Sequence, residues 1–218
     1  MGSIFSLDSP LMRGLGRIAD MMILSVLWIV CSIPLVSIGA STTALYTMTL
    51  RMVRDEEGNL ISGFLQAFKE NFKQATAIHL ILTVLAAFLY VYLQIVSMLP
   101  EQMKLIFWAA TVLFGFIWLM EMLFVYPVQA RFENTLGNTM KNAWLIAASN
   151  VPMLLGVIVI SVLPVLTVLL NTMLFFRMLP LWIFLAPGLI AWLNSFLFQI
   201  CFRRYLPEEE EDKMAEEV

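Results

Sequence analysis

Long apolar runs dominate the hydrophobic pattern of the chain. A helix needs about 20 apolar residues to cross the hydrocarbon of a bilayer, which is about 30 Å thick, because each residue adds about 1.5 Å. Five segments meet this requirement, namely residues 19–38, 76–99, 105–126, 151–172 and 181–202. The pattern therefore predicts an all-α fold, a polytopic transmembrane helix bundle with about five spans.

The connections between the spans differ in length. Residues 100–104 and 175–180 are short, so the pattern predicts tight helical hairpins there. Residues 39–75 and 127–150 are longer and hold most of the polar residues, and each contains an amphipathic segment that runs into the next span. This order is either a weak internal repeat of span, amphipathic helix and span, or a chance similarity between the two halves.

Two cytoplasmic amphipathic helices are predicted within the long connections. Between residues 61 and 72, aromatic and aliphatic side chains recur every three or four positions, and Lys, Glu and Gln fall between them. Between residues 136 and 144, apolar residues repeat a four-residue step. Helices of this kind lie in the headgroup plane or against the spans. The expected docking surface comprises Phe64, Phe68, Lys69, Asn71, Phe72, Lys73, Arg131, Lys141 and Trp144.

The distribution of Lys and Arg leaves two orientations open. With five crossings and an outside N-terminus, nine basic residues lie inside and four outside, but Arg13 and Arg17 then sit on the disfavoured side of the first span. If residues 19–50 instead form a broken hairpin that bends at Pro34 and Gly39, the N-terminus lies inside and the count becomes eleven against two. Such a hairpin would be re-entrant or shallow, because its 32 residues give only about 48 Å of helix. Both orientations place the C-terminus in the cytoplasm.

A third reading of the N-terminal region is a cleaved signal peptide. The basic residues Arg13 and Arg17 would precede an apolar core at residues 21–33, which is followed by the helix-breaking Pro34. Against this reading, the translocated mature chain would begin close to a basic loop. The mass of the intact purified protein shows whether such a signal peptide has been removed.

The composition favours a membrane environment and excludes a nucleic-acid surface. Of the 218 residues, 61% are hydrophobic and 13% are charged, whereas ordinary globular proteins have about 45–50% apolar and about 25% charged residues. The formal net charge of −3 arises at the C-terminal end, where seven acidic residues fall within residues 208–218, and the remainder carries a net charge of +3. That excess suits anionic headgroups and is too sparse for nucleic acid. The sequence thus predicts one transmembrane domain, residues 1–206, with the lipid bilayer as its partner, and an acidic disordered tail, residues 207–218.

The third span contains a single charged residue, Glu121. One interpretation is a proton or cation ligand that faces an internal cavity near Asn194, Gln199 or Gln129, because ionisable groups inside membrane helices are costly and usually functional. The other interpretation is positional, since Glu121 lies near the end of the span, where it can reach the interface or pair with an Arg. The candidate functional polar residues are therefore Glu121, Asn194 and Gln199.

The remaining reactive residues do not form a recognisable catalytic or metal site. His79 is the sole histidine and lies at the start of the second span, where an interfacial or packing role is expected. Cys31 and Cys201 lack CxxC spacing and are expected to be small buried hydrophobic residues. No GxSxG, HExxH, Walker or dinucleotide-binding pattern occurs in the sequence. We therefore expect no enzyme activity, no catalytic residue, no cofactor and no metal.

The N-terminal third carries a specific sequence pattern. Its stretches are SPLMR at 9–13, RIAD at 17–20, LW at 27–28, IPLV at 33–36, IGASTTALY at 38–46, VRDEEG at 53–58 and FKENFKQA at 68–75. This pattern resembles the YesL-like bacterial membrane proteins, a family of unknown function (domain of unknown function 624). Beyond residue 76 the similarity is one of hydropathy and overall length, and the acidic tail from Glu208 is not part of the pattern.

The resemblance implies a biological setting rather than a chemistry. Members of the family occur mostly in Gram-positive bacteria and are often encoded beside sugar-binding lipoproteins, sugar permeases of the ATP-binding-cassette (ABC) type and glycan-degrading enzymes. The resemblance therefore implies a non-enzymatic accessory or regulatory partner of a carbohydrate uptake system in the cell membrane, with sugar ABC permease subunits as its protein partners. The alternative is a small transporter or channel that uses Glu121 in the third span.

Overall fold

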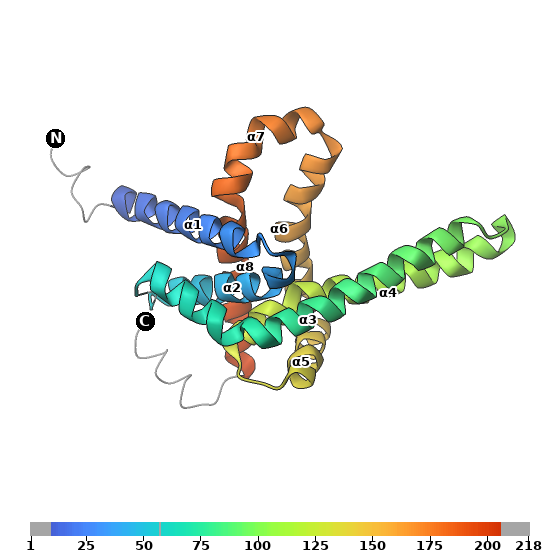
Figure 1. The fold of residues 1–218 in the computed structure, drawn as a ribbon, viewed down its shortest axis with the longest axis horizontal. Coiled ribbons are helices and arrows are strands. Elements are labelled where there is room, and N and C mark those ends of the chain that lie inside the picture. The colour runs from blue at the N-terminus through green and yellow to red at the C-terminus, as the bar shows by residue number, and fades with distance from the viewer. Residues whose placement is uncertain (1–9, 57, 206–218) are drawn as a thin grey trace.

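The computed structural model describes residues 10–56 and 58–205, which form eight α-helices and no strand (Figure 1). This confirms the predicted all-α fold. The predicted acidic tail, residues 207–218, and its boundary with the helical domain lie outside the described residues. The helices are α1 (Pro10–Ser32), α2 (Ile38–Val53), α3 (Leu60–Ser97), α4 (Glu101–Arg131), α5 (Leu136–Ser149), α6 (Val151–Leu170), α7 (Thr172–Phe184) and α8 (Ala186–Phe202).

Helix α1 ends at the break that the sequence predicts. Pro34 has no backbone N–H to continue a helix, and a short 3-10 turn, Leu35–Ser37, connects α1 to α2. The Ser37 hydroxyl lies within hydrogen-bond distance of two carbonyl oxygens at the end of α1 and in the turn, those of Cys31 (2.6 Å) and Pro34 (2.7 Å). The first predicted span is therefore shifted towards the N-terminus, since the apolar helix runs from Met12 to Ser32 rather than over residues 19–38.

Helices α1 and α2 form an antiparallel hairpin around this break. Close to the turn, Trp28 Nε1 donates a hydrogen bond to Thr42 Oγ1 at 3.1 Å. At the open end, Arg17 forms an ion pair with Asp55, which follows α2. One contact lies beside the turn and the other joins the start of α1 to the end of α2, so the two helices run side by side. The broken hairpin considered for the second orientation is therefore the shape that the chain adopts.

Helix α2 lies at the centre of the molecule and packs against α1, α3, α4 and α8. Twelve of its 16 residues are buried, many of them Ser or Thr. Their hydroxyls donate to carbonyl oxygens four residues earlier, as Ser41 does to Ser37 at 3.0 Å, so burial leaves them hydrogen-bonded. Gly39 does not bend the chain as predicted; it lies within α2, where a Cβ atom would be 2.4 Å from the Ala75 carbonyl oxygen of α3. The apolar-run pattern predicted a connection over residues 39–75 and missed this helix.

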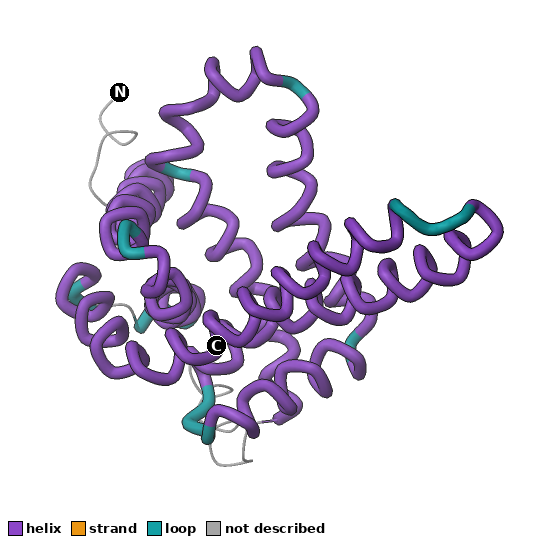
Figure 2. Tube along the Cα trace, turned by 45° about the vertical axis from the view of Figure 1, so that its right-hand side comes forward, coloured by secondary structure: helices purple, strands orange, loops and turns teal. Residues whose placement is uncertain are grey.

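Helix α3 is one continuous helix of 38 residues that combines the first amphipathic segment with the second predicted span. Its first half runs antiparallel to α2, because Gly39 faces Ala75 and Gly63 faces Met48. Its second half continues beyond α2 and lies beside α4. The two helices project from the body of the molecule as a long hairpin, which both ribbon views show (Figures 1 and 2).

The α3–α4 hairpin closes tightly, as predicted, with only residues 98–100 between its helices. Two contacts establish which positions lie opposite one another. Trp118 Nε1 of α4 donates to the Leu82 carbonyl oxygen of α3 at 2.9 Å, and the rings of Tyr92 and Phe107 lie 6.4 Å apart. Glu121, three residues beyond Trp118, therefore lies at the end of the hairpin nearest the body.

The C-terminal half is bent in two places. The chain bends by 103° between α5 and α6, at Asn150, and by 58° between α7 and α8, at Leu185. Only Asn171 separates α6 from α7, and its Oδ1 accepts a hydrogen bond from Leu174 N at 3.1 Å. The predicted hairpin loop at residues 175–180 is wrong. Asn171 caps the start of α7, so residues 175–180 lie inside this helix.

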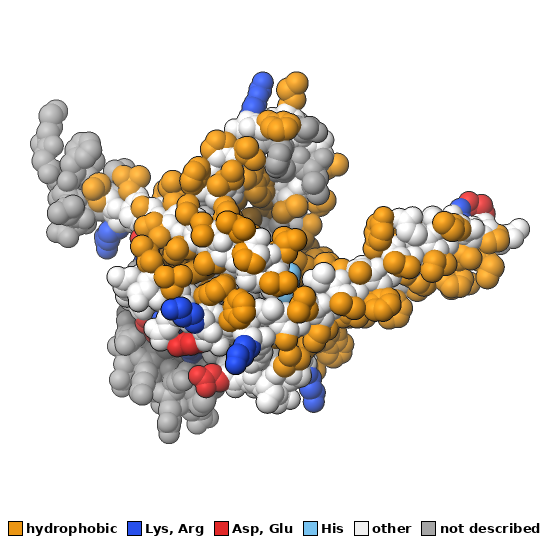
Figure 3. Space-filling view, viewed as in Figure 1, with side chains coloured by type: hydrophobic (Ala, Val, Ile, Leu, Met, Phe, Trp, Pro, Cys, Tyr) orange, Lys and Arg blue, Asp and Glu red, His pale blue; other side chains and the backbone are white. Residues whose placement is uncertain are grey.

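Among the described residues, three helices are long and apolar enough to cross a membrane, and the number rises to five if each bent pair is one span. The three lie in α1, α3 and α4, and the pairs are α5 with α6 and α7 with α8. The predicted number of about five spans agrees with the upper value. Hydrophobic side chains cover much of the outer surface of the projecting helices (Figure 3). This exterior is that expected of a multi-pass membrane protein.

Candidate functional site

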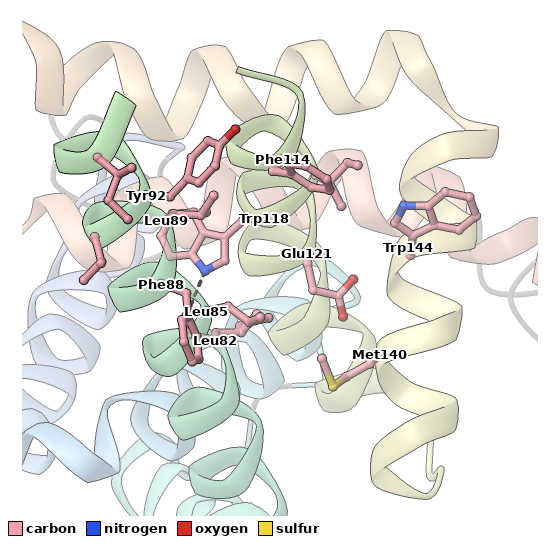
Figure 4. A pocket seen from close by; sticks show the side chains of 13 residues that line it. Leu82, Leu85, Phe88, Leu89, Tyr92, Phe114, Trp118, Glu121, Met140 and Trp144 are labelled. Atoms are coloured by element: carbon pink, nitrogen blue, oxygen red, sulfur yellow. Dashed lines mark hydrogen bonds between the residues drawn. The ribbon is translucent and has the colours of Figure 1, made fainter. Parts of the chain in front are cut away.

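Glu121 is a buried carboxylate at the base of the α3–α4 hairpin. Its residue is only 8% exposed, and its Oε1 has no hydrogen-bond partner among the described residues. The carboxyl group points into the space between α4 and α5, towards Met140 and Trp144 (Figure 4). Buried polar atoms in native proteins are nearly always hydrogen-bonded, so an unsatisfied carboxylate oxygen calls for a functional explanation.

A groove of about 710 Å³ surrounds this carboxylate. Its walls come from the second half of α3, the facing side of α4 and the first half of α5. Apart from Glu121 the lining is almost entirely aliphatic and aromatic. The lining residues are Leu82, Leu85, Phe88, Leu89, Val91, Tyr92, Ile95, Phe114, Ile117, Trp118, Glu121, Met140 and Trp144. The groove therefore has one polar end and a long apolar remainder.

Asn194 lies elsewhere, in a polar seam between α8, α2 and α6. It is fully buried, and its Nδ2 donates to Ser161 Oγ at 2.8 Å and lies 3.3 Å from the Tyr46 hydroxyl oxygen. One residue further along α8, Ser195 Oγ lies 2.8 Å from Thr49 Oγ1. These bonds tie α8 to α2 and α6, so the geometry of Asn194 is that of a residue that holds helices together.

The three candidate polar residues do not share one pathway. Neither Asn194 nor Gln199 is among the residues that line the groove around Glu121. Gln199 is half-buried on α8. Gln129 is buried, and its Nε2 lies 3.4 Å from Asn71 Oδ1. The transporter interpretation requires these groups to line a common passage, and the structure does not bring them together.

A second cavity, of about 520 Å³, lies between α1, α2, α3, α4, α6, α7 and α8. Its polar wall includes Tyr46, Ser161, His79 and Tyr126, and His79 Nδ1 lies 2.9 Å from the Tyr126 hydroxyl oxygen. This hydrogen bond supports the predicted packing role of His79. Sequence reasoning missed the two tyrosines and Ser161, because single polar residues within apolar runs give no periodic signal.

The predicted docking surface is partly exposed and partly internal. Phe64 is 0% exposed and packs within the core, so it cannot contact a partner protein. Asn71 is half-buried, and its Nδ2 donates to the Ala67 carbonyl oxygen at 2.9 Å. Phe68 and Arg131 are also half-buried. The exposed members are Lys69, Phe72, Lys73, Lys141 and Trp144.

The two amphipathic segments, which are far apart in the sequence, lie next to each other in the fold. Gln74 Nε2 of α3 lies 3.0 Å from both the Asn134 carbonyl oxygen and Thr139 Oγ1. This contact places the exposed part of α3 beside the start of α5. Lys and Arg side chains gather on this side of the visible face, below the apolar helices in Figure 3. We call the five exposed residues Lys69, Phe72, Lys73, Lys141 and Trp144 the basic-aromatic surface.

Within the described residues, no cluster of three or more His, Cys, Asp or Glu side chains is placed to hold a metal ion. Cys201 is buried and Cys31 is half-buried, and both are free thiols. The predicted burial is therefore confirmed for Cys201, whereas Cys31 is only partly buried. The chemistry available at the described sites is hydrogen bonding and apolar contact, together with the single charge of Glu121.

Comparisons with known proteins give one match. Neither the curated proteins nor the solved structures include one that matches the chain. The family model described as "Protein of unknown function, DUF624" matches residues 21–93, about a third of the chain, which extend from α1 through α2 and most of α3. YesL-like is a name used for this family, so the resemblance carried by the N-terminal third is confirmed, and over residues 21–93 the chain matches the DUF624 family, whose function is unknown.

Proposed function

We propose that this protein is a non-enzymatic, multi-pass protein of the bacterial cell membrane that acts as an accessory or regulatory partner of an ABC-type carbohydrate uptake system. The observation that carries the proposal is the basic-aromatic surface, to which α3 and α5 contribute side by side. The kind of partner follows from the YesL-like resemblance, which implies sugar permease subunits as neighbours.

The ion pair between Arg17 and Asp55 supports a cytoplasmic position for this surface. The pair places the start of α1 beside the end of α2, which carries Arg51, and the α2–α3 connection, which carries Arg54. An inside N-terminus then gives the count of eleven basic residues inside and two outside, Lys104 and Arg177. The basic-aromatic surface faces the cytoplasm in this orientation, where the cytoplasmic loops of a permease are accessible.

The composition of the surface suits protein contact. Phe72 is 39% and Trp144 45% exposed, and large aromatic side chains are the residues that most often dominate binding energy at interfaces. The three lysines around them supply charge, which affects the rate of association and the choice of partner more than affinity. Together they suit a partner surface that carries acidic residues around an apolar pocket.

The test is recovery of permease subunits with the tagged protein from native membranes in a mild detergent. The combined substitutions Lys69→Glu, Lys73→Glu and Lys141→Glu reverse the charge of the surface, and we expect at least a tenfold loss of recovered permease, because like charges across an interface cost several kcal/mol. The matched control is Lys104→Glu, since Lys104 lies at the far tip of the hairpin, where it pairs with Glu101 at 2.6 Å.

Two outcomes contradict the proposal. In the first, the wild-type protein is recovered without any permease subunit under conditions that preserve known transporter complexes. In the second, the triple variant recovers as much permease as the control. Elution of the variant at the wild-type volume in size-exclusion chromatography shows that a loss of recovery is not a loss of fold.

A further inference from the structure

The α3–α4–α5 groove has the polarity of an amphiphile. Trp118 lies opposite Leu82, so Glu121 is at the end of the hairpin nearest the body, beside Met140 and Trp144 of α5. From there the groove extends along α3 to Ile95 without another carboxylate. A ligand that fills it needs a polar group at one end and a long apolar part along the hairpin.

The depth of Glu121 matches the level of the headgroups in one leaflet. Lys104 and Glu101 pair at the far tip of the hairpin, and 17 residues of α4 separate Lys104 from Glu121. At about 1.5 Å per residue this is about 26 Å, close to the hydrocarbon thickness of about 30 Å. With the tip at one interface, Glu121 lies near the other, next to the amphipathic helix α5.

The apolar part of the groove is longer than one leaflet and is open to the bilayer. From Leu82 to Ile95 the wall follows 13 residues of α3, or about 20 Å, against about 15 Å for half of the hydrocarbon thickness. Its side chains are reachable from outside, since Phe88 is 69% and Ile95 55% exposed. An acyl chain that lies in the bilayer can enter this groove sideways.

Glu121 Oε1 can accept a hydrogen bond from a ligand, because no described residue donates to it and the groove lining around it is apolar. A primary ammonium has three N–H donors and a positive charge, and hydrogen bonds between charged groups are roughly twice as strong as neutral ones. A trimethylammonium group has the charge but no N–H. The site therefore distinguishes headgroups by whether they can donate.

We propose that this groove binds one phospholipid whose headgroup carries a primary ammonium, such as phosphatidylethanolamine. The ammonium donates to Glu121, and an acyl chain lies along the apolar wall of the hairpin. A transmembrane helix of a partner protein fits less well, because the apolar side chains of such a helix leave Glu121 Oε1 without a donor. The site shares Trp144 with the basic-aromatic surface, but it does not depend on the proposed function.

The test is native mass spectrometry of the full chain in detergent, titrated with phosphatidylethanolamine, its N-methyl and N,N-dimethyl derivatives, and phosphatidylcholine with the same acyl chains. We expect the wild-type protein to bind phosphatidylethanolamine about tenfold more tightly than phosphatidylcholine, as the loss of one charged hydrogen bond predicts. Affinity falls as each methyl group replaces an N–H of the headgroup. Phosphatidylcholine has no N–H left, so it is bound without the preference that phosphatidylethanolamine has.

Variants assign the preference to the carboxylate. Glu121→Met removes both the charge and the acceptor and keeps the side-chain length, so it binds all four lipids equally. Glu121→Gln keeps an acceptor without the charge, and its preference is intermediate. The matched control is Glu101→Met, because Glu101 is an exposed carboxylate at the other end of α4. This control keeps the full wild-type preference.

Several results overturn the proposal. Equal affinity of the wild-type protein for phosphatidylethanolamine and phosphatidylcholine does so, and this comparison stands even if the Glu121 variants fail to fold. A preference that persists in Glu121→Met also overturns it. So does photo-crosslinking from Phe88 in native membranes that captures a polypeptide in place of lipid, because the groove is then a protein interface.

Discussion

Replacing Gly39 by alanine tests the central packing of α2 against α3. A Cβ atom at this position would lie 2.4 Å from the Ala75 carbonyl oxygen and 2.7 Å from His79 Cβ, whereas ordinary contacts begin at 3.4 Å. The backbone of α3 cannot rotate away as a flexible side chain would, so the two helices must separate by about 1 Å, an overpacking that typically costs about 1–3 kcal/mol. We expect Gly39→Ala to lower the free energy of unfolding by this amount in a titration with a denaturing detergent.

The control for this measurement is Gly115→Ala. Gly115 is also helical, in α4, but nothing lies within 4 Å of a Cβ atom added there. Alanine has a higher helix propensity than glycine by about 1 kcal/mol in a helix interior. Gly115 lies in such an interior, whereas Gly39 is the second residue of α2 and gains less. The difference between the two variants is therefore the packing cost plus up to about 1 kcal/mol of helix propensity. Equal unfolding free energies for the two variants would refute the arrangement of α2 and α3.

Three further outcomes follow from individual contacts. In a background without native cysteines, a cysteine at Asp55 reacts with a membrane-impermeant thiol reagent only from the cytoplasmic side, and one at Lys104 only from the opposite side; labelling of both from one side contradicts the proposed orientation. Asn194→Leu removes the donor to Ser161 and lowers the unfolding free energy by about 1–3 kcal/mol, and the same change at the half-buried Gln199 serves as the control. The ion pair of Asp55 adds no more than about 1 kcal/mol, because its side chain is 82% exposed, and a double-mutant cycle measures this value.

Hydrophobic runs predict lipid-facing helices well and buried polar helices poorly. The runs at residues 76–99 and 105–126 lie within α3 and α4, where two paired helices expose apolar side chains along most of their length. The apolar-run pattern missed helix α2 because protein surrounds it, and only the alternative broken hairpin over residues 19–50 placed a helix there. Thr43 and Thr49 satisfy their hydroxyls on the carbonyl oxygens of their own helix, so burial does not require apolar side chains at those positions.

Periodicity in residues 61–72 predicted an apolar helix face correctly but did not reveal what covers that face. Phe64 packs against the core, whereas Phe72, two turns later, is 39% exposed. The same limit applies to Glu121. Its isolation among apolar residues is visible in the sequence, but the α5 side chains that close its groove lie about 20 residues away and are brought there by tertiary contacts. Spacing along one helix carries no information about such partners.

The α1–α2 hairpin removes the conflict in the charge distribution. An outside N-terminus leaves Arg13 and Arg17 on the wrong side. The proposed orientation has four full crossings, namely α3, α4, the α5–α6 pair and the α7–α8 pair, one fewer than the five candidate spans. In this orientation α1 does not cross, and α1 and α2 enter and leave from the cytoplasm. At about 24 Å, the 16 residues of α2 are too short to cross about 30 Å of hydrocarbon. A helix that ends within the membrane is tolerated only where protein buries its free backbone groups. The break at residues 33–37 meets this condition in part, because the Ser37 hydroxyl reaches the Cys31 carbonyl oxygen and α3 packs against the turn.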